Sequence, residues 1–257
     1  MATYTHISLE HSFQGKIATV TLRRPDVHNA FNTSLIEELH SAFGELSSDE
    51  RLHGVVLTGE GRSFCAGADI GMMKQAATFS EEENVQDALR LADLFGRINT
   101  FPCPVVARVN GSAFGGGVGL IAACDIAIAA ESARFAFSEV KLGIAPAVIS
   151  PYVISKIGAT HARVLFVTGE RFSAARAYAI GLVHSVVPPE KLDEAVDQAV
   201  NELLSSAPLA LRACKTLALT VGEMNAQEAR RYTAETVARL RVSKEGQERL
   251  AAFLEKR

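Results

Sequence analysis

The chain has 257 residues, 48% of them hydrophobic and 21% charged, and its formal net charge is −3. This composition is typical of a soluble globular protein with one large core, or a core and a small appendage. Because 26 basic side chains face 29 acidic ones, the chain lacks the basic excess that binds a nucleic-acid backbone. We therefore expect no nucleic-acid partner.

The cysteines and the apolar runs exclude further classes. The four cysteines are widely spaced and form no C-x-x-C pair, so neither a metal site nor a disulfide framework is predicted. Residues 1–16 are polar and lack the apolar core of a signal peptide. The longest apolar run, Val118–Ala130, contains Asp125 and is shorter than the ~20 residues that span a bilayer. We expect a cytoplasmic protein without a membrane segment.

Strands and helices alternate in the first part of the chain. Period-2 alternation and continuous apolar runs predict strands, and apolar stripes at helical spacing predict helices. The predicted strands are Ile17–Leu22, Gly54–Thr58 and Val105–Val109. One helix is predicted to begin near Ser34, which matches a capping box with Glu37, and a second helix is predicted over Glu83–Asn99.

The central stretch, Asn110–Glu139, holds the glycine run Gly115–Gly119 between a strand and an apolar helix start at Val118–Ala123. A tight turn before a helix exposes backbone N–H groups, and with the helix dipole these favour negative charge. The glycines could equally serve to let a helix pack closely on a strand. A dinucleotide loop is excluded, because its third glycine would fall at Leu120, and no Gly-Lys-Ser/Thr of a P-loop follows.

The C-terminal half is mostly helical. Its predicted elements are helices at Ile149–Ile157 and Ala159–Thr168, a turn and helix at Gly169–Ile180, a strand at Val183–Val187, and helices from Glu190 onward. We predict an α/β core of repeated strand–strand–helix units over residues 1–190 and a helical segment over 191–257. A tail without strands is expected to pack on the body or on a neighbouring subunit.

Several motifs occur in a fixed order: Cys65–Ile70, Asn110–Gly117, Cys124–Ile126, Phe135–Glu139, Leu142–Pro146, Thr168–Ala174, Gly181–Val183 and Phe253–Arg257. Over essentially the whole chain, this ordered set resembles the enoyl-CoA hydratase/isomerase (crotonase) superfamily. The resemblance implies the ClpP/crotonase-like fold and a trimerisation role for the C-terminal helices, in a homotrimer or a hexamer of two trimers. It implies no cofactor, since CoA arrives as part of an acyl-CoA thioester substrate.

The resemblance also implies an oxyanion hole, in which the backbone N–H groups of Ala68 and Gly116 hold the thioester oxygen while an enolate forms. Gly116 opens a helix whose dipole would favour that charge. By the same resemblance, residues of two loops would contact the CoA moiety: Val27, His28 and Ala30 in the first, and Ala66, Ala68, Asp69 and Ile70 in the second, together with Gly116. Arg23, Arg24 and Lys256 are candidates for the CoA phosphates, but we interpret each as a solvated surface charge.

Glu139 matches one of the two glutamates that hydratases of this superfamily use to hold a water. It lies in an apolar segment, where burial would raise its pKa and suit it to proton transfer. The other glutamate is expected three residues after Gly116, but Gly119 stands there. Glu139 is therefore the predicted catalytic carboxylate.

The segments Gly115–Leu120, Ser138–Gly143 and Pro146–Tyr152 are most similar to bacterial methylglutaconyl-CoA hydratases of leucine breakdown. The predicted function is hydration of an α,β-unsaturated acyl-CoA, with 3-methylglutaconyl-CoA or a similar branched ester as substrate. A double-bond isomerase that uses Glu139 alone is the alternative. A non-catalytic CoA-ester-binding protein and a hydrolase or decarboxylase remain open. RNA binding, known from a mitochondrial relative with a lysine-rich helix, is not expected, because residues 34–49 contain no lysine.

Overall fold

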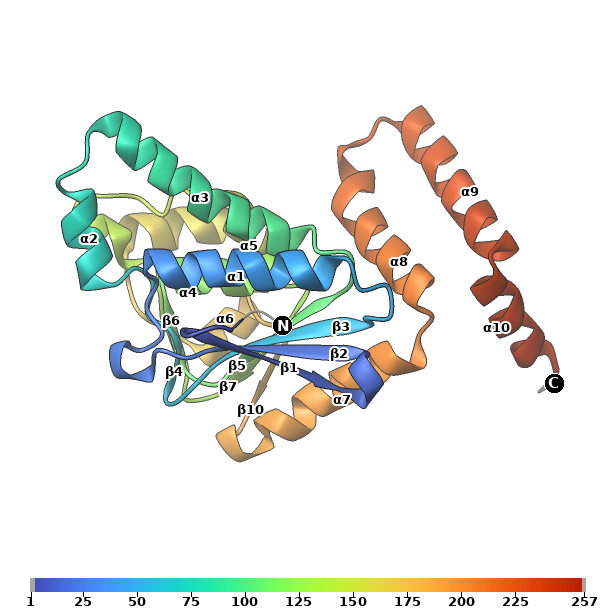
Figure 1. The fold of residues 1–257 in the computed structure, drawn as a ribbon. Helices are drawn as coiled ribbons and strands as arrows, with labels where there is room; N and C mark the ends of the chain where they lie inside the picture. Colours follow the sequence, from blue (N-terminus) through green and yellow to red (C-terminus); the bar gives the residue numbers. More distant parts are fainter. Residues whose placement is uncertain (1–2, 256–257) are drawn as a thin grey trace.

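The computed structural model describes residues 3–255, which form two β-sheets, covering helices and a helical tail (Figure 1). The large sheet has the order β1-β2-β3-β5-β7-β10 and the small sheet β4-β6-β8-β9. Only the pairs β1–β2 and β8–β9 are antiparallel among these strands. The strands are β1 (Ile7–Ser12), β2 (Ile17–Leu22), β3 (Gly54–Gly59), β4 (Ser63–Cys65), β5 (Val105–Val109), β6 (Ser112–Phe114), β7 (Ile126–Ala130), β8 (Arg134–Ala136), β9 (Phe172–Ser173) and β10 (Ser185–Val187).

A strand–strand–helix unit repeats along the chain. β3 and β4 precede α2 and α3, β5 and β6 precede α4, and β7 and β8 precede α5; the first strand of each unit joins the large sheet and the second the small one. This confirms the predicted α/β fold of repeated units. The helices are α1 (Thr33–Ser47), α2 (Ile70–Ala76), α3 (Glu81–Asn99), α4 (Gly116–Ala123), α5 (Ser150–Thr168), α6 (Ala174–Ala179), α7 (Leu192–Ser205), α8 (Pro208–Thr220), α9 (Ala226–Val242) and α10 (Lys244–Glu255).

The large sheet is buried on both faces, which explains its continuous apolar strands. Successive strand residues point to opposite faces. Val55 and Val105 face the main core, while their neighbours Val56 and Val106 face a second cluster closed by side chains of α7. Each strand therefore needs apolar residues at consecutive positions, as parallel strands covered by helices do.

The predicted helical segment divides into two parts. α7 closes the second core cluster and α8 packs against the body, with Leu211 on that cluster, whereas α9 and α10 lie farther out (Figure 1). α8 is anchored by Lys215, whose Nζ lies 2.7 Å from Oδ2 of Asp125 and donates to the carbonyl oxygen of Cys103. Within residues 3–255, no helix is long and apolar enough to cross a membrane.

Local details differ from the sequence predictions. α1 is capped by Asn32, whose side chain accepts from the Leu35 N–H, so the predicted Ser34–Glu37 capping box is wrong. The two helices predicted on either side of Gly158 are confirmed: they form the two arms of α5 and are separated by Gly158, whose backbone is not helical (φ 70°, ψ 160°). β1 is absent from the predicted strands: its sequence, ISLEHS, holds only two apolar residues, and most of its side chains are exposed or partly exposed.

Candidate active site

Two predicted backbone donors lie on neighbouring segments, one in the loop after β4 and one at the start of α4. Gly67, with φ 85°, lets its loop lie against the start of α4: a Cβ on Gly67 would lie 2.8 Å from the Phe114 carbonyl oxygen and 3.6 Å from the Gly116 amide nitrogen. The structure thus brings the predicted donors Ala68 and Gly116 onto adjoining segments. A side chain at position 67 would separate them.

Within the described residues, neither donor is used by the fold. The residues beside Ala68 are paired, since Phe31 N–H donates to Gly67 O and Asp69 N–H donates to Phe31 O, and these bonds leave the Ala68 N–H free. Gly116 is the first residue of α4, where N–H groups have no partner in the preceding turn. Two unpaired N–H groups, one of them at a helix N-terminus, can stabilise an oxyanion.

Glu139 lies directly beside this helix start. It belongs to the 3₁₀ segment Ser138–Leu142, and a Cβ on Gly115 would lie 2.9 Å from its Oε1. Within residues 3–255, Oε2 is the one buried side-chain oxygen or nitrogen without a hydrogen-bond partner. Burial raises the pKa of the Glu139 carboxyl, and its own backbone N–H offsets part of that effect. A half-buried carboxyl with one unpartnered oxygen and a raised pKa is suited to proton transfer.

The other side of α4 carries no carboxylate. Gly119 is buried, and a Cβ there would lie 2.3 Å from Cγ2 of Ile149 and 3.1 Å from Cζ of Phe95. The place of the second glutamate is therefore filled by hydrocarbon. The sequence alone shows that position 119 carries no side chain. Only the structure shows that Ile149, thirty residues later, fills the space.

The two loops predicted to contact CoA are joined to each other. Ala66 N–H donates to the His28 carbonyl oxygen at 3.0 Å, and a parallel bridge links Phe31 and Ala68. The imidazole of His28 lies 2.9 Å from the Ser63 hydroxyl. Of the predicted contact residues, Val27 and Ile70 are exposed, Ala66, Ala68 and Asp69 are partly buried, and the side chain of Ala30 is buried.

Arg24 connects these loops, and its interpretation as a solvated surface charge is wrong. Its guanidinium pairs with Asp69 at 2.9 Å, with only 15% and 16% of the two side chains exposed, and it also donates to the Ala30 carbonyl oxygen. Asp69 in turn accepts from the Met72 N–H and caps α2. Arg23 pairs at the surface with Glu60, and Lys256 lies outside the described residues.

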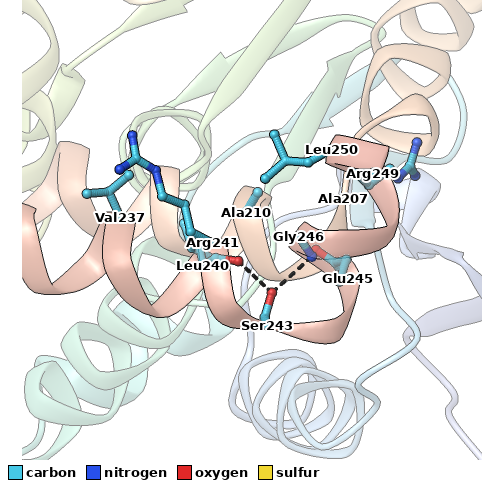
Figure 2. A pocket seen from close by; sticks show the side chains of 10 residues that line it. All are labelled: Ala207, Ala210, Val237, Leu240, Arg241, Ser243, Glu245, Gly246, Arg249 and Leu250. Atoms are coloured by element: carbon cyan, nitrogen blue, oxygen red, sulfur yellow. Dashed lines mark hydrogen bonds between the residues drawn. The ribbon is translucent and has the colours of Figure 1, made fainter. Parts of the chain in front are cut away.

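A separate groove of about 250 Å³ lies in the tail and includes none of these residues (Figure 2). Its walls are apolar side chains of α8, α9 and α10, such as Ala210, Val237 and Leu250. The Ser243 hydroxyl, which donates to Leu240 O and accepts from Gly246 N–H, sets the bend between α9 and α10.

Comparison with known proteins decides the family. The model of the enoyl-CoA hydratase/isomerase family matches residues 12–257. The chain belongs to this family. It is 34% identical to the short-chain-enoyl-CoA hydratase of Clostridium acetobutylicum over 95% of this chain and 93% of that protein, and 32% identical to the 2,3-dehydroadipyl-CoA hydratase of Escherichia coli over 96% and 95%.

Solved structures confirm the predicted crotonase fold. The enoyl-CoA hydratase from Shewanella pealeana superposes with a TM-score of 0.93 at 39% identity, covering 98% of this chain and 94% of that one. The methylglutaconyl-CoA subtype is not among the names of these relatives and stays a prediction, as do the roles of the individual site residues.

Proposed function

We propose that this enzyme hydrates an α,β-unsaturated acyl-CoA, with Glu139 as its single catalytic carboxylate. The observation that carries the proposal is the buried, unpartnered Oε2 of Glu139 beside the free N–H groups of Ala68 and Gly116. Relatives along nearly the full chain are named as hydratases, which supports the same reaction.

The site contains a group for the negative charge on the thioester oxygen and a group for the proton of the attacking water. The thioester oxygen would accept from the Ala68 and Gly116 N–H groups, and negative charge would develop there as water adds to the β-carbon. Removing one such donor typically costs ~10²–10³ in rate. Glu139, as carboxylate, would take a proton from the attacking water and then deliver it to the α-carbon.

A direct assay tests this function. Loss of the conjugated enoyl absorbance of crotonyl-CoA and 3-methylglutaconyl-CoA should be catalysed by the wild type and should fall to near background in Glu139→Gln. If Glu139→Gln hydrates as fast as the wild type, Glu139 is not the catalytic group. If the wild type hydrates neither ester, the hydratase assignment is wrong.

We further propose that the natural substrate is 3-methylglutaconyl-CoA or a related branched enoyl-CoA with a distal carboxylate. The similarity of Gly115–Leu120 and Pro146–Tyr152 to methylglutaconyl-CoA hydratases supports this, and the substrate named for the Escherichia coli relative also carries a distal carboxylate. A higher kcat/KM for crotonyl-CoA than for the carboxylated ester would contradict it.

A double-bond isomerase is the second candidate, and the apolar contact between Gly119 and Ile149 favours it. Moving one proton along an allylic system needs one carboxylate and no water. Conversion of a 3-enoyl-CoA into its conjugated isomer, without hydration of crotonyl-CoA, would establish this activity.

We also propose that the tail joins copies of the chain into a trimer or a hexamer. α9 contacts α8 and α10. Val237 and Val242 of α9 and Leu250 of α10 are 44%, 78% and 48% exposed. Exposed apolar residues at this density are expected to be covered in an assembly. Light scattering should give a mass of three or six chains, and Val242→Glu should reduce it; a monomeric wild type would contradict the proposal.

A further inference from the structure

Position 119 has no room for any side chain. A Cβ built on Gly119 would lie 2.3 Å from Cγ2 of Ile149, closer than carbon atoms approach without a bond, and 3.0 Å from its Cβ. Gly119 is therefore in van der Waals contact with Ile149, and no water fits between them. Even alanine at this position would require Ile149 to move.

Ile149 belongs to an apolar wall of three side chains, Phe31, Phe95 and Ile149. They come from the loop before α1, from α3 and from the residue before α5, and each is at most 3% exposed. The Phe31 and Phe95 rings meet edge to face at 6.4 Å, and a Cβ on Gly116 would lie 2.9 Å from Phe31 Cε2. Because separate elements hold these side chains, the wall cannot easily yield.

The apolar wall runs along the same stretch of α4 as the proposed oxyanion donor. Residues three apart lie on one helix face, about 4.5 Å apart along the axis, so Gly119 follows Gly116 by just under one turn. The α- and β-carbons of an acyl group held through its thioester oxygen at Gly116 lie within that distance of the oxygen. With an acyl group held in this way, Ile149 would lie near the carbons to which the proton and the hydroxyl group are added.

We propose that Ile149 determines which acid–base groups the site contains. Its side chain fills the space that a second acid–base side chain on α4 would need, so that Glu139 is the only carboxylate that acts on the substrate. The proposal rests on the proposed function, because it concerns how the same site handles water. The water must then be held on the Glu139 side of α4. Glu139 accepts a proton from it as the C–O bond forms and returns that proton to the α-carbon, so one molecule of water is added and no other reactant is needed.

A double-mutant cycle tests the steric part of this proposal without any activity measurement. Gly119→Glu should lower Tm by about 5–10 °C, because it overpacks the wall. Adding Ile149→Gly should restore at least half of that loss. The pair Gly119→Ala and Ile149→Gly serves as a milder version if the glutamate variant does not fold. The matched control is Gly222→Glu, at a position where a Cβ would meet nothing within 4 Å, and its Tm should equal that of the wild type.

The pH profile of crotonyl-CoA hydration tests the chemical part. We expect one titrating carboxyl group in the wild type and two in the Gly119→Glu/Ile149→Gly variant, with hydration at least about tenfold faster in that variant. A wild-type Tm for Gly119→Glu, no restoration by Ile149→Gly, or identical pH profiles would each overturn the proposal. A wild type that hydrates no enoyl-CoA would instead refute the proposed function, while the Tm cycle would still decide whether Ile149 controls position 119.

Discussion

Two carboxylates at opposite ends of α4 have opposite surroundings. Asp125, just after the helix, accepts from the Val105 N–H and from Nζ of Lys215, each at 2.7 Å. Glu139, beside the N-terminal end, has a buried Oε2 without a partner. A buried polar group without a partner costs free energy, so the fold is expected to keep one only where it serves another purpose. Asp125 stabilises the structure, and Glu139 is available for chemistry.

The largest expected effect is on the rate of hydration, and it tests whether Glu139 is catalytic rather than structural. Glu139→Gln should lower kcat for enoyl-CoA hydration by ~10²–10⁴, because an amide cannot accept or deliver the proton. Its Tm should equal or exceed that of the wild type, since the substitution removes a poorly solvated charge. Steady-state kinetics and thermal denaturation on the same preparation measure both. Glu131→Gln, at an exposed position, is the matched control and should change neither quantity. A large drop in the Tm of Glu139→Gln would show that the carboxylate is structural.

The complementary effect is on stability. Lys215→Met keeps the length of the side chain but leaves Asp125 without its cation, and the Lys215 side chain is only 4% exposed. Removing one partner of a buried ion pair costs ~3–5 kcal/mol, and because the Asp125 side chain is 24% exposed we expect about 2–3 kcal/mol. Tm should fall by about 5–10 °C.

The control for this prediction is another ion pair of the same length. Lys191 and Glu194 also lie 2.7 Å apart, but both side chains are 60% exposed. Lys191→Met should leave Tm unchanged, since surface pairs contribute little. If Lys215→Met has no greater effect than Lys191→Met, or if it lowers kcat of the folded enzyme, the division of roles between Asp125 and Glu139 is wrong.

A smaller effect is expected from moving the Ala68 N–H donor, without any change to Glu139. Arg24 holds Asp69 and the Ala30 carbonyl together, and so fixes the loop that presents Ala68. A lysine cannot replace the planar fork of donors at such a site. Arg24→Lys should therefore lower kcat/KM by about ten- to a hundredfold, as expected when a donor is misplaced. Arg51→Lys is the control, since the Arg51 side chain pairs with Asp49 but is 75% exposed. Equal kinetics for the two variants would assign Arg24 a purely local role.

Patterns within one segment could be predicted from the sequence, and contacts between segments could not. The continuous apolar runs at Gly54–Thr58 and Val105–Val109 predict buried parallel strands, because the pattern records burial on both faces. The turn at Gly115 before an apolar run predicts the free N–H group at the start of α4. Each of these features depends on neighbouring residues alone.

Arg24 and Ile149 illustrate what the sequence does not reveal. Arg24 and Asp69 are forty-five residues apart, and Gly119 and Ile149 are thirty apart, so no spacing rule connects them. The sequence around Arg24, with a proline and an aspartate beside it, is typical of a solvated arginine. In the folded chain its side chain is covered by two loops that the local sequence does not bring together. The same limit explains why the Ser34–Glu37 match failed: Asn32 is an equally good cap, and tertiary packing decides where α1 begins.

The pH dependence of stability gives the smallest effect and the most direct comparison of Glu139 in the folded and unfolded chain. Burial raises the pKa of the Glu139 carboxyl in the folded state, so the unfolded chain ionises first as the pH rises. The stability due to protonated Glu139 is therefore fully present below the unfolded pKa, about 4.3, and is lost as pH rises through the folded pKa. The difference in Tm between wild type and Glu139→Gln should shift in favour of the variant over that interval. A difference that stays constant from pH 4 upward would mean that the carboxyl is solvated and lacks the raised pKa that proton transfer requires.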